Sequence, residues 1–171
     1  MNVLIEARPG AGKTTALKRV AELLRGSGVT VAGFVTQEMR VRGRRVGFEI
    51  ETLLRGEWGT LAHVDMPGPP RVGRYGVDLG QFERLALPAL QASAQAMLID
   101  ELGKMELASA PFRTAVLKLL DRATPVAATI QTHRDPFTDE LKQRRDIELV
   151  RLTHANRDRL PAWVAERILD L

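Results

Sequence analysis

The sequence predicts an α/β fold: a three-layer α/β/α domain with a mostly parallel sheet and an antiparallel β insertion near residues 39–64. After residue 77, short apolar stretches alternate with helix-like stretches, which is typical of parallel strands covered by helices on both faces. The segment 29–64 is rich in β-branched residues and turn signals and has no long helical pattern. With 171 residues, the chain is long enough for one domain with a substantial core, so we expect a single domain over residues 1–171.

The N-terminal segment predicts a strand, a glycine-rich turn and a helix. The run MNVLIEA is apolar, and the helix expected at 14–25 carries apolar residues at helical spacing. Gly26-Ser27-Gly28 ends it, as glycine commonly does. The next segment predicts only β structure, with a hairpin around Arg42–Arg44 and a second turn at Arg55-Gly56-Glu57. Residues Asp65–Gly76 are rich in Pro and Gly and are expected to form a loop.

The remaining elements are expected to alternate. Asp78 suits the N-cap of one helix, Pro111 lies near the first turn of another, and Asn156 suits the N-cap of the last. The expected elements, in order, are a helix at 78–94, a strand at 96–102, a helix at 112–121, a strand at 125–131, a short helix at 137–145, a strand at 147–152 and a helix at 156–171.

The glycine-rich turn indicates a phosphate-binding loop. It matches the pattern G-x-x-x-x-G-K-[ST], except that Ala7 stands in place of the first glycine. In such a loop, glycine lets the backbone amides turn toward a phosphate, and the N-terminus of the following helix adds further amides. The lysine reaches the β- and γ-phosphates, and the hydroxyl of the Ser or Thr binds Mg²⁺. Because the match lies between a strand and a helix, we prefer this interpretation to a structural turn. The predicted nucleotide-binding residues of the loop are Ala7, Arg8, Pro9, Gly10, Ala11, Gly12, Lys13, Thr14 and Thr15.

A second chemical signal is the pair Asp100-Glu101, at the end of an apolar strand. Proteins with a phosphate-binding loop commonly place the Mg²⁺ carboxylate there, so we predict Thr14 and Asp100 as the metal ligands. Glu101 is the predicted base that orients and deprotonates an attacking water. The alternative is a solvated acidic pair. Lys13 and Lys104 complete the predicted catalytic residues, although Lys104 suits a simple ion pair equally well.

Other ionisable residues give weaker signals. Arg134, Arg144 and Arg145 are candidates for a transition-state arginine, but arginines in surface ion pairs are far commoner. The three histidines have no metal-ligand spacing, and we interpret them as structural or surface residues. They are His63, His133 and His154.

Four segments occur in this order along the chain: GAGKTT, GRYGVD (Gly73–Asp78), IDELGKMEL (Ile99–Leu107) and NRDRLP (Asn156–Pro161). Together they resemble the small P-loop nucleoside-triphosphatases, a family that includes the cancer-related nucleoside-triphosphatase and its archaeal and bacterial relatives. The resemblance implies a P-loop NTPase fold related to nucleotide kinases. It also implies Mg²⁺-dependent hydrolysis of ATP, GTP, CTP and UTP to the diphosphate and phosphate.

The same resemblance implies that Asn156 and Arg157 lie near the base of the bound nucleotide. For Asn156, the alternative is a simple helix N-cap. The chain departs from the family at Glu6-Ala7-Arg8, where a Thr-Gly pair is usual. Glu6 would repel phosphates unless it turned away or paired with a basic group such as Arg8. Few side chains look placed to read a base edge, so we expect low base selectivity.

Composition limits the partners and the compartment. The net charge is +4, and a short cluster of arginines lies at RVRGRR (Arg40–Arg45). Such a cluster leaves nucleic acid open as a partner without establishing it, because no aromatic platform accompanies it. There is no Cys, which excludes disulfides and Cys-ligated zinc. With no membrane-spanning run and no leader, we expect a cytoplasmic protein whose partners are nucleoside triphosphates; the oligomeric state stays open.

A nucleotide or small-molecule kinase of related fold is the alternative function. In that case the loop at 65–77 would help to bind an acceptor. Two observations favour hydrolysis: no arginine-rich lid is evident, and Glu101 beside Asp100 suits water as the nucleophile.

Overall fold

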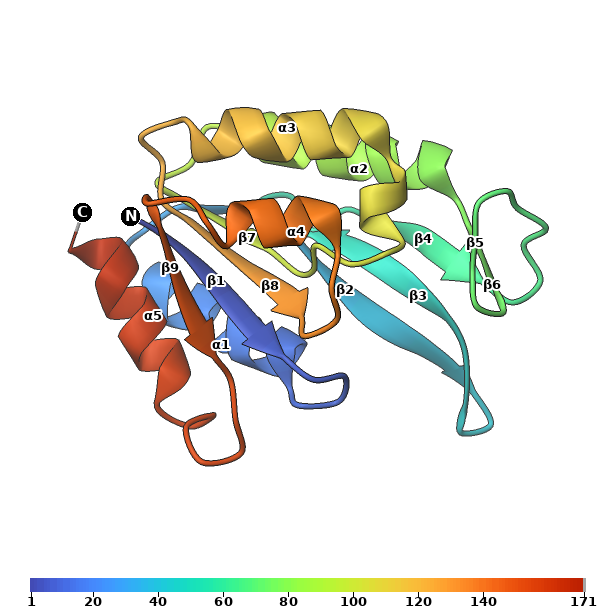
Figure 1. Ribbon diagram of the computed structural model, residues 1–171, viewed down its shortest axis with the longest axis horizontal. Helices are drawn as coiled ribbons and strands as arrows, with labels where there is room; N and C mark the ends of the chain where they lie inside the picture. Colours follow the sequence, from blue (N-terminus) through green and yellow to red (C-terminus); the bar gives the residue numbers. More distant parts are fainter. Residues whose placement is uncertain (171) are drawn as a thin grey trace.

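The computed structural model describes residues 1–170, whose strands form one mixed sheet (Figure 1). The strand order is β5-β6-β4-β3-β2-β7-β8-β1-β9. Strands β2, β7, β8, β1 and β9 run parallel, whereas β2 to β6 pair antiparallel with one another. The strand bounds are β1 Asn2–Ala7, β2 Val31–Val41, β3 Arg44–Thr52, β4 Trp58–His63, β5 Arg71–Val72, β6 Tyr75–Val77, β7 Ala96–Ile99, β8 Val126–Gln131 and β9 Ile147–Arg151.

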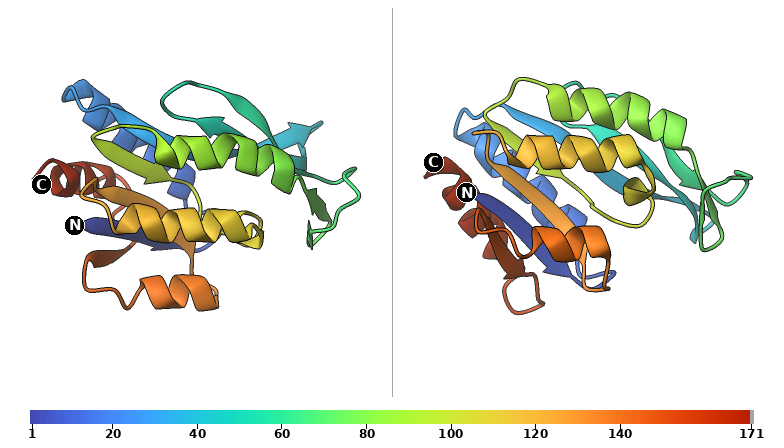
Figure 2. Two further views of the ribbon diagram at one scale, coloured as in Figure 1. Left: turned by 90° about the horizontal axis from the view of Figure 1, so that it is seen from above. Right: turned by 45° about the horizontal axis from the view of Figure 1, so that its top comes forward.

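Helices cover both faces of the sheet, so the predicted three-layer α/β/α fold is confirmed (Figures 1 and 2). One face packs against α1 and α5, and its core includes Leu17 and Val164. The other face packs against α2, α3 and α4, and its core includes Phe34, Phe82 and Phe112 in mutual aromatic contact. The helix bounds are α1 Lys13–Gly26, α2 Leu79–Gln91, α3 Ala110–Leu120, α4 Pro136–Leu141 and α5 Leu160–Leu169, with a short 3-10 turn, η1, at Glu106–Ala108.

The antiparallel part of the sheet is larger than the sequence predicts. Strand β2 belongs to both halves: it pairs with β7 as far as Phe34 and then continues beside β3 alone. The hairpin predicted around Arg42–Arg44 joins β2 to β3. The loop expected at Asp65–Gly76 is wrong in part, because β5 and β6 form a second small hairpin there. Buried Tyr75 and Val77 fix β6 against β4, a signal that the surrounding Pro and Gly residues obscured.

The predicted helix starts lie within two residues of the observed ones, except at the last helix. Asp78 caps α2, its carboxylate accepting a hydrogen bond from the Gln81 N–H at 2.9 Å. Helix α5 begins at Leu160, so Asn156 is not its N-cap. The predicted end of this helix and of the domain, Leu171, lies outside the described residues. None of the helices in residues 1–170 is long and apolar enough to cross a membrane.

Candidate functional site

The glycine-rich loop connects the carboxyl end of β1 to the N-terminus of α1. Gly10 and Gly12 have φ of 78° and 93°, in the left-handed region that favours glycine. Gly12 is the N-cap residue of α1, and Lys13 begins the helix. Ala7 is not among the residues with positive φ, and its methyl group is buried in the core beneath α1. Alanine is therefore compatible with this strand end, and the missing first glycine costs the loop little.

Asp100 lies next to this loop, buried at the end of β7 with 1% of its surface exposed. Three threonine hydroxyls donate to its carboxylate, each from a different element. Thr14 of α1 donates to Oδ2 at 2.5 Å, Thr129 of β8 donates to Oδ1 at 2.6 Å, and Thr36 of β2 approaches Oδ2 at 3.5 Å. Because Asp100 is buried and bonded, the alternative of a solvated acidic pair is wrong for this residue. The Thr14 hydroxyl and the Asp100 carboxylate present adjacent oxygen donors, which suits Mg²⁺.

Glu101 faces the same loop. Its Oε2 lies 3.7 Å from Nζ of Lys13, and its Oε1 accepts a hydrogen bond of 2.8 Å from Nε2 of Gln131 at the end of β8. Burial raises the pKa of Glu101, while the charge of Lys13 and the hydrogen bond from Gln131 act in the opposite direction. The carboxylate is thus oriented, partly desolvated and close to the cation that the loop carries.

A third carboxyl group, that of Glu106, lies behind Glu101. Gly103 separates them: a Cβ added to this glycine would stand 2.8 Å from Oε1 of Glu101 and 2.9 Å from Oε2 of Glu106. Burial, followed by the charge of Glu101, raises the pKa of Glu106 well above its ordinary value. A side chain at position 103 would therefore displace the carboxyl groups of Glu101 and Glu106 from their present positions.

Sequence reasoning missed four residues of this cluster. They are Thr36, Thr129, Gln131 and Glu106. Thr36 lies on β2 just past the part that pairs with β7, and Thr129 and Gln131 lie near the carboxyl end of β8, the other neighbour of β7. Their positions were visible in the sequence, but the strand order that makes them neighbours of Asp100 was not.

Beside the loop lies a pocket of about 500 Å³, formed by the segments that follow β1, β8 and β9. Its lining residues are Ala7, Arg8, Ala11, Thr132, Arg151, Leu152, Thr153 and His154. Asn156 shapes its wall: the side chain accepts from the Thr153 N–H and donates to the Arg151 carbonyl, both at 2.8 Å. These two bonds explain why Asn156 is not the cap of α5. Arg157 is not among the lining residues, so the predicted roles of Asn156 and Arg157 near the base stay predictions.

The remaining sequence candidates differ in their positions. Lys104 is exposed and forms no ion pair within residues 1–170, so its catalytic role stays a prediction.

Arg134 pairs with Asp139 at 3.2 Å. Arg144 bonds Asp121 and Asp146, both at 2.8 Å. Arg144 and Arg145 precede β9, which runs parallel to β1, so they lie at the opposite edge of the sheet from the loop. Neither is suited to stabilise a transition state there.

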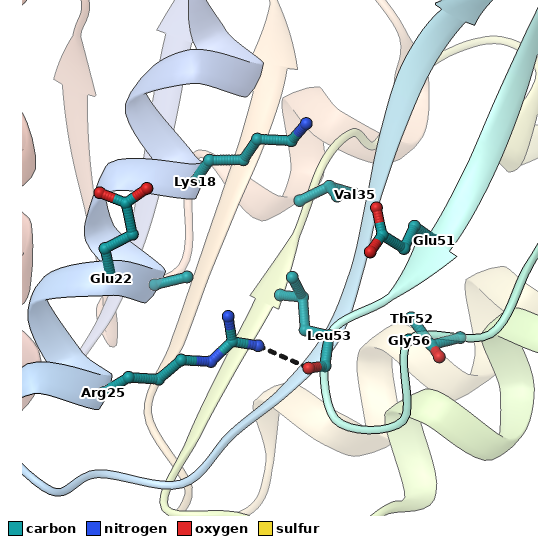
Figure 3. Close-up of a pocket in the computed structure, with 9 residues that line it drawn as sticks. Lys18, Glu22, Arg25, Val35, Glu51, Thr52, Leu53 and Gly56 are labelled. Atoms are coloured by element: carbon teal, nitrogen blue, oxygen red, sulfur yellow. Dashed lines mark hydrogen bonds between the residues drawn. The ribbon is translucent and has the colours of Figure 1, made fainter.

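A second pocket, of about 320 Å³, lies between α1 and the antiparallel strands (Figure 3). Arg25 of α1 donates a hydrogen bond to the Leu53 carbonyl across it. Figure 3 shows the carboxylates of Glu22 and Glu51 around the same space as Lys18. Because the lining carries both signs of charge, it does not favour a triphosphate.

Glu6 turns away from the phosphate loop. Its side chain is almost buried on β1 and pairs with Lys142, after α4, at 2.6 Å and with Arg151 of β9 at 3.3 Å. The expected partner, Arg8, is not the one found. The hydrogen bond from Lys142 lowers the pKa of Glu6, although burial partly opposes it. The sequence led us to expect that Glu6 would repel phosphates, but Lys142 and Arg151 neutralise its charge.

The Glu6 cluster predicts a dependence of stability on pH. A carboxylate with a lowered pKa stabilises the fold above its unfolded pKa, near 4.5, and loses this contribution as pH falls through the lowered value. We expect Glu6→Gln to lower the free energy of unfolding at neutral pH by about 2–3 kcal/mol, since Lys142 loses its partner while Arg151 is largely exposed. Urea denaturation at pH 7 and pH 3 measures this, and the difference between variant and parent should shrink at the lower pH.

The matched control is Glu148→Gln. Glu148 also lies in this sheet and pairs with Arg167 at 3.4 Å, but both side chains are partly exposed. Such pairs contribute only about 0–1 kcal/mol. If the two variants lost equal stability at pH 7, the Glu6 cluster would be an ordinary surface ion pair.

Comparison with known proteins adds independent information. The NTPase family matches residues 2–165. The nucleoside-triphosphatase THEP1 of Thermotoga sp. (strain RQ2) is 44% identical over 163 residues, covering 94% of this chain and 91% of the relative. The cancer-related nucleoside-triphosphatase homolog of Mus musculus is 40% identical over 177 residues, covering 93% of this chain and 92% of the relative.

Two solved structures have the same fold. The crystal structure of THEP1 from the hyperthermophile Aquifex aeolicus superposes with a TM-score of 0.86 at 32% identity, covering 98% of this chain and 99% of the other. The solution structure of a human cancer-related nucleoside triphosphatase also gives a TM-score of 0.86, at 37% identity, covering 99% of this chain and 97% of the other. These similarities extend over the strands and loops that form the site.

Proposed function

The chain belongs to the NTPase family and is a nucleoside-triphosphate hydrolase, and we propose that it transfers the γ-phosphoryl group to water at the site formed by the phosphate loop, Asp100 and Glu101. The observation that carries this proposal is the position of Glu101, 3.7 Å from Nζ of Lys13. Lys13 is expected at the β- and γ-phosphates, so a carboxylate beside it is within reach of a water attacking the γ-phosphorus. The kinase alternative finds no support among the relatives.

The residues present fit a Mg²⁺ ion. The Thr14 hydroxyl and the Asp100 carboxylate lie side by side at the start of α1, and Mg²⁺ prefers few protein oxygens together with phosphates and water. When bound, Mg²⁺ neutralises charge on the β- and γ-phosphates. Thr129 and Thr36 hold the Asp100 carboxylate in place from the neighbouring strands.

The proposed chemistry assigns one task to each side chain. The loop amides and Lys13 hold the triphosphate in line with the attacking water. Gln131 fixes Oε1 of Glu101, which leaves Oε2 on the side of Lys13 to accept the proton of that water. A bond forms between the water oxygen and the γ-phosphorus, and the bond to the β,γ-bridging oxygen breaks. The raised pKa of Glu101 makes it a stronger base than an exposed carboxylate.

Phosphate release tests this proposal directly. ATP, GTP, CTP and UTP are supplied with and without Mg²⁺, and each again with a nucleoside monophosphate. We expect one free phosphate for each diphosphate formed, a requirement for Mg²⁺, and no effect of the monophosphate. Phosphorylation of the monophosphate in place of phosphate release would contradict hydrolysis.

The proposal includes a cytoplasmic location, because nucleoside triphosphates and Mg²⁺ are abundant there.

Base selectivity is expected to be low. The pocket beside the loop offers short hydroxyls and a histidine, from Thr132, Thr153 and His154, and a hydroxyl can either donate to or accept from a base edge. We expect kcat/KM for ATP and GTP to differ by less than about a hundredfold, roughly 3 kcal/mol. Steady-state kinetics with the four triphosphates measures this. A larger difference would require a pocket built around one base.

A further inference from the structure

The tip of the β2–β3 hairpin stands apart from the rest of the sheet. Strand β2 has no second neighbour after Phe34, and β3 meets β4 only from Gly47 onward. Residues Arg40–Arg45, here called the hairpin arm, therefore form a two-stranded ribbon whose outer edges pair with no further strand among the described residues. All six residues are exposed, and Figure 1 shows the arm reaching beyond the neighbouring strands.

The arm is rich in positive charge. Four of its six residues are arginine, and none is acidic. The chain has 25 basic and 21 acidic residues. The net charge of +4 therefore equals the charge of the arm alone, and the remainder of the chain is balanced. Such a localised charge points to an anionic partner at the arm.

Two of these arginines are held and two are not. Glu38 binds Arg40 at 2.7 Å and Arg45 at 3.2 Å. Arg45 also donates to the Tyr75 hydroxyl at 2.9 Å. Arg42 and Arg44 form no hydrogen bond or ion pair through their side chains within residues 1–170. The arm thus presents the guanidinium groups of Arg42 and Arg44, unpaired within the described part of the chain, while Arg40 and Arg45 are held in place by Glu38 and Tyr75.

The backbone at the tip gives an independent indication. Arg42 has φ of 50° and Gly43 has φ of 77°. Hairpin turns with two positive φ values favour Asn-Gly or Gly-Gly, because a long side chain is strained in the left-handed region. Arg42 is the only residue other than glycine with positive φ within residues 1–170. A cationic side chain at a backbone position that favours glycine or asparagine indicates that its charge is used.

The neighbouring β5–β6 hairpin extends the basic surface. Arg74 donates to the Arg45 carbonyl and, at 3.3 Å, to the Tyr75 hydroxyl. Arg71 donates to the Arg74 carbonyl at 2.7 Å. The Tyr75 ring is buried under these arginines and only 6% exposed, so it cannot stack on a base. The surface consequently suits phosphates and not the unstacked bases of a single strand.

We propose that the hairpin arm binds double-stranded DNA, with Arg42 and Arg44 on the phosphates that flank the major groove. A two-stranded ribbon, with its strands about 4.8 Å apart, fits a groove about 12 Å wide. Arginine suits phosphate because its planar guanidinium donates two parallel hydrogen bonds. Strand β2 runs parallel to β1, so the arm rises from the sheet edge that carries the phosphate loop. Bound DNA would lie on the same side of the molecule as the nucleotide.

Binding of a fluorescein-labelled DNA duplex of about 20 base pairs, two helical turns, tests this proposal by anisotropy. The full chain is titrated at salt concentrations from about 50 to 200 mM. The variant Arg42→Gly/Arg44→Gln keeps the turn, because glycine suits the backbone at position 42. Each lost phosphate contact should reduce the salt slope by about 0.9, so we expect a reduction of about 2 and at least tenfold weaker binding at low salt. The melting temperature and phosphate release should not change.

Arg55→Gln is the matched control. Arg55 lies in the turn at the opposite end of β3, with 80% of its side chain exposed, and its loss should leave DNA binding unchanged. The proposal fails if the parent does not bind duplex DNA at low salt, if the arm variant binds like the parent, or if the control weakens binding equally. It also fails if single-stranded RNA or polyglutamate displaces the arm-bound probe more effectively than unlabelled duplex, since the arm would then serve another class of partner.

Discussion

Glu101→Gln is expected to lower kcat by about 10²–10⁴ while Mg·ATP still binds. The replacement preserves the size of the side chain and an oxygen that accepts the hydrogen bond from Gln131, but it removes the base. Binding should survive because Lys13, Thr14 and Asp100 remain in place. Single-turnover phosphate release measures the chemical step, and equilibrium titration with a fluorescent ATP analogue measures binding.

The pH profile separates a base from a merely structural carboxylate. Because burial raises the pKa of Glu101, activity of the parent should fall as pH is lowered through a value above that of an ordinary glutamate. The residual activity of the Gln variant should lack this limb. Glu166→Gln, at an exposed position of α5, is the control and should behave like the parent. Hydrolysis by Glu101→Gln at the parent rate would remove Glu101 from the mechanism.

Lys13→Ala is expected to abolish most nucleotide binding. Lys13 is 8% exposed and lies 3.7 Å from Oε2 of Glu101, so its loss removes the cation from the phosphates and leaves a partly buried carboxylate without its partner. Because the cation at the β- and γ-phosphates is lost, affinity for Mg·ATP should fall at least about a hundredfold, roughly 3 kcal/mol. Isothermal titration measures the affinity.

Lys18→Ala gives the matched control in the same helix. Lys18 lies on α1 and donates to Gln37 at 3.1 Å, and its loss should change affinity by less than about threefold, as expected for an exposed polar contact. Lys18→Ala should retain the melting temperature of the parent within a few degrees, whereas Lys13→Ala should lower it, because Glu101 loses its ion-pair partner. Equal affinity of the Lys13 variant and the parent would mean that this loop does not hold the triphosphate.

The parts of the site that are continuous in the sequence could be predicted. The loop from Ala7 to Thr15 joins one strand to one helix, so its conformation follows from local glycines and its position follows from its neighbours. The Asp100-Glu101 pair could be placed at a strand end for the same reason. Local chemistry also identified the Asp78 cap and the hairpin around Gly43.

The parts of the site that depend on the order of the strands in the sheet could not be predicted from the sequence. Thr36 and Thr129 reach Asp100 only because β2 and β8 flank β7, and no local pattern states that arrangement. Glu6 finds its cations more than 130 residues away in the chain. Asn156 illustrates a different limit. An asparagine before a helix can either cap the helix or bond the segment that precedes it. In this structure Asn156 bonds the Arg151–Thr153 segment, a choice that the local sequence does not specify.

The cluster of Glu6, Lys142 and Arg151 also has an evolutionary consequence. Substitution of Glu6 alone, for example by the threonine that the resemblance leads us to expect there, would leave two cations facing a neutral side chain beside the phosphate loop. A lineage can pass between the two states only through intermediates that are less stable or that attract stray anions. The three positions are therefore expected to change together among relatives of this chain.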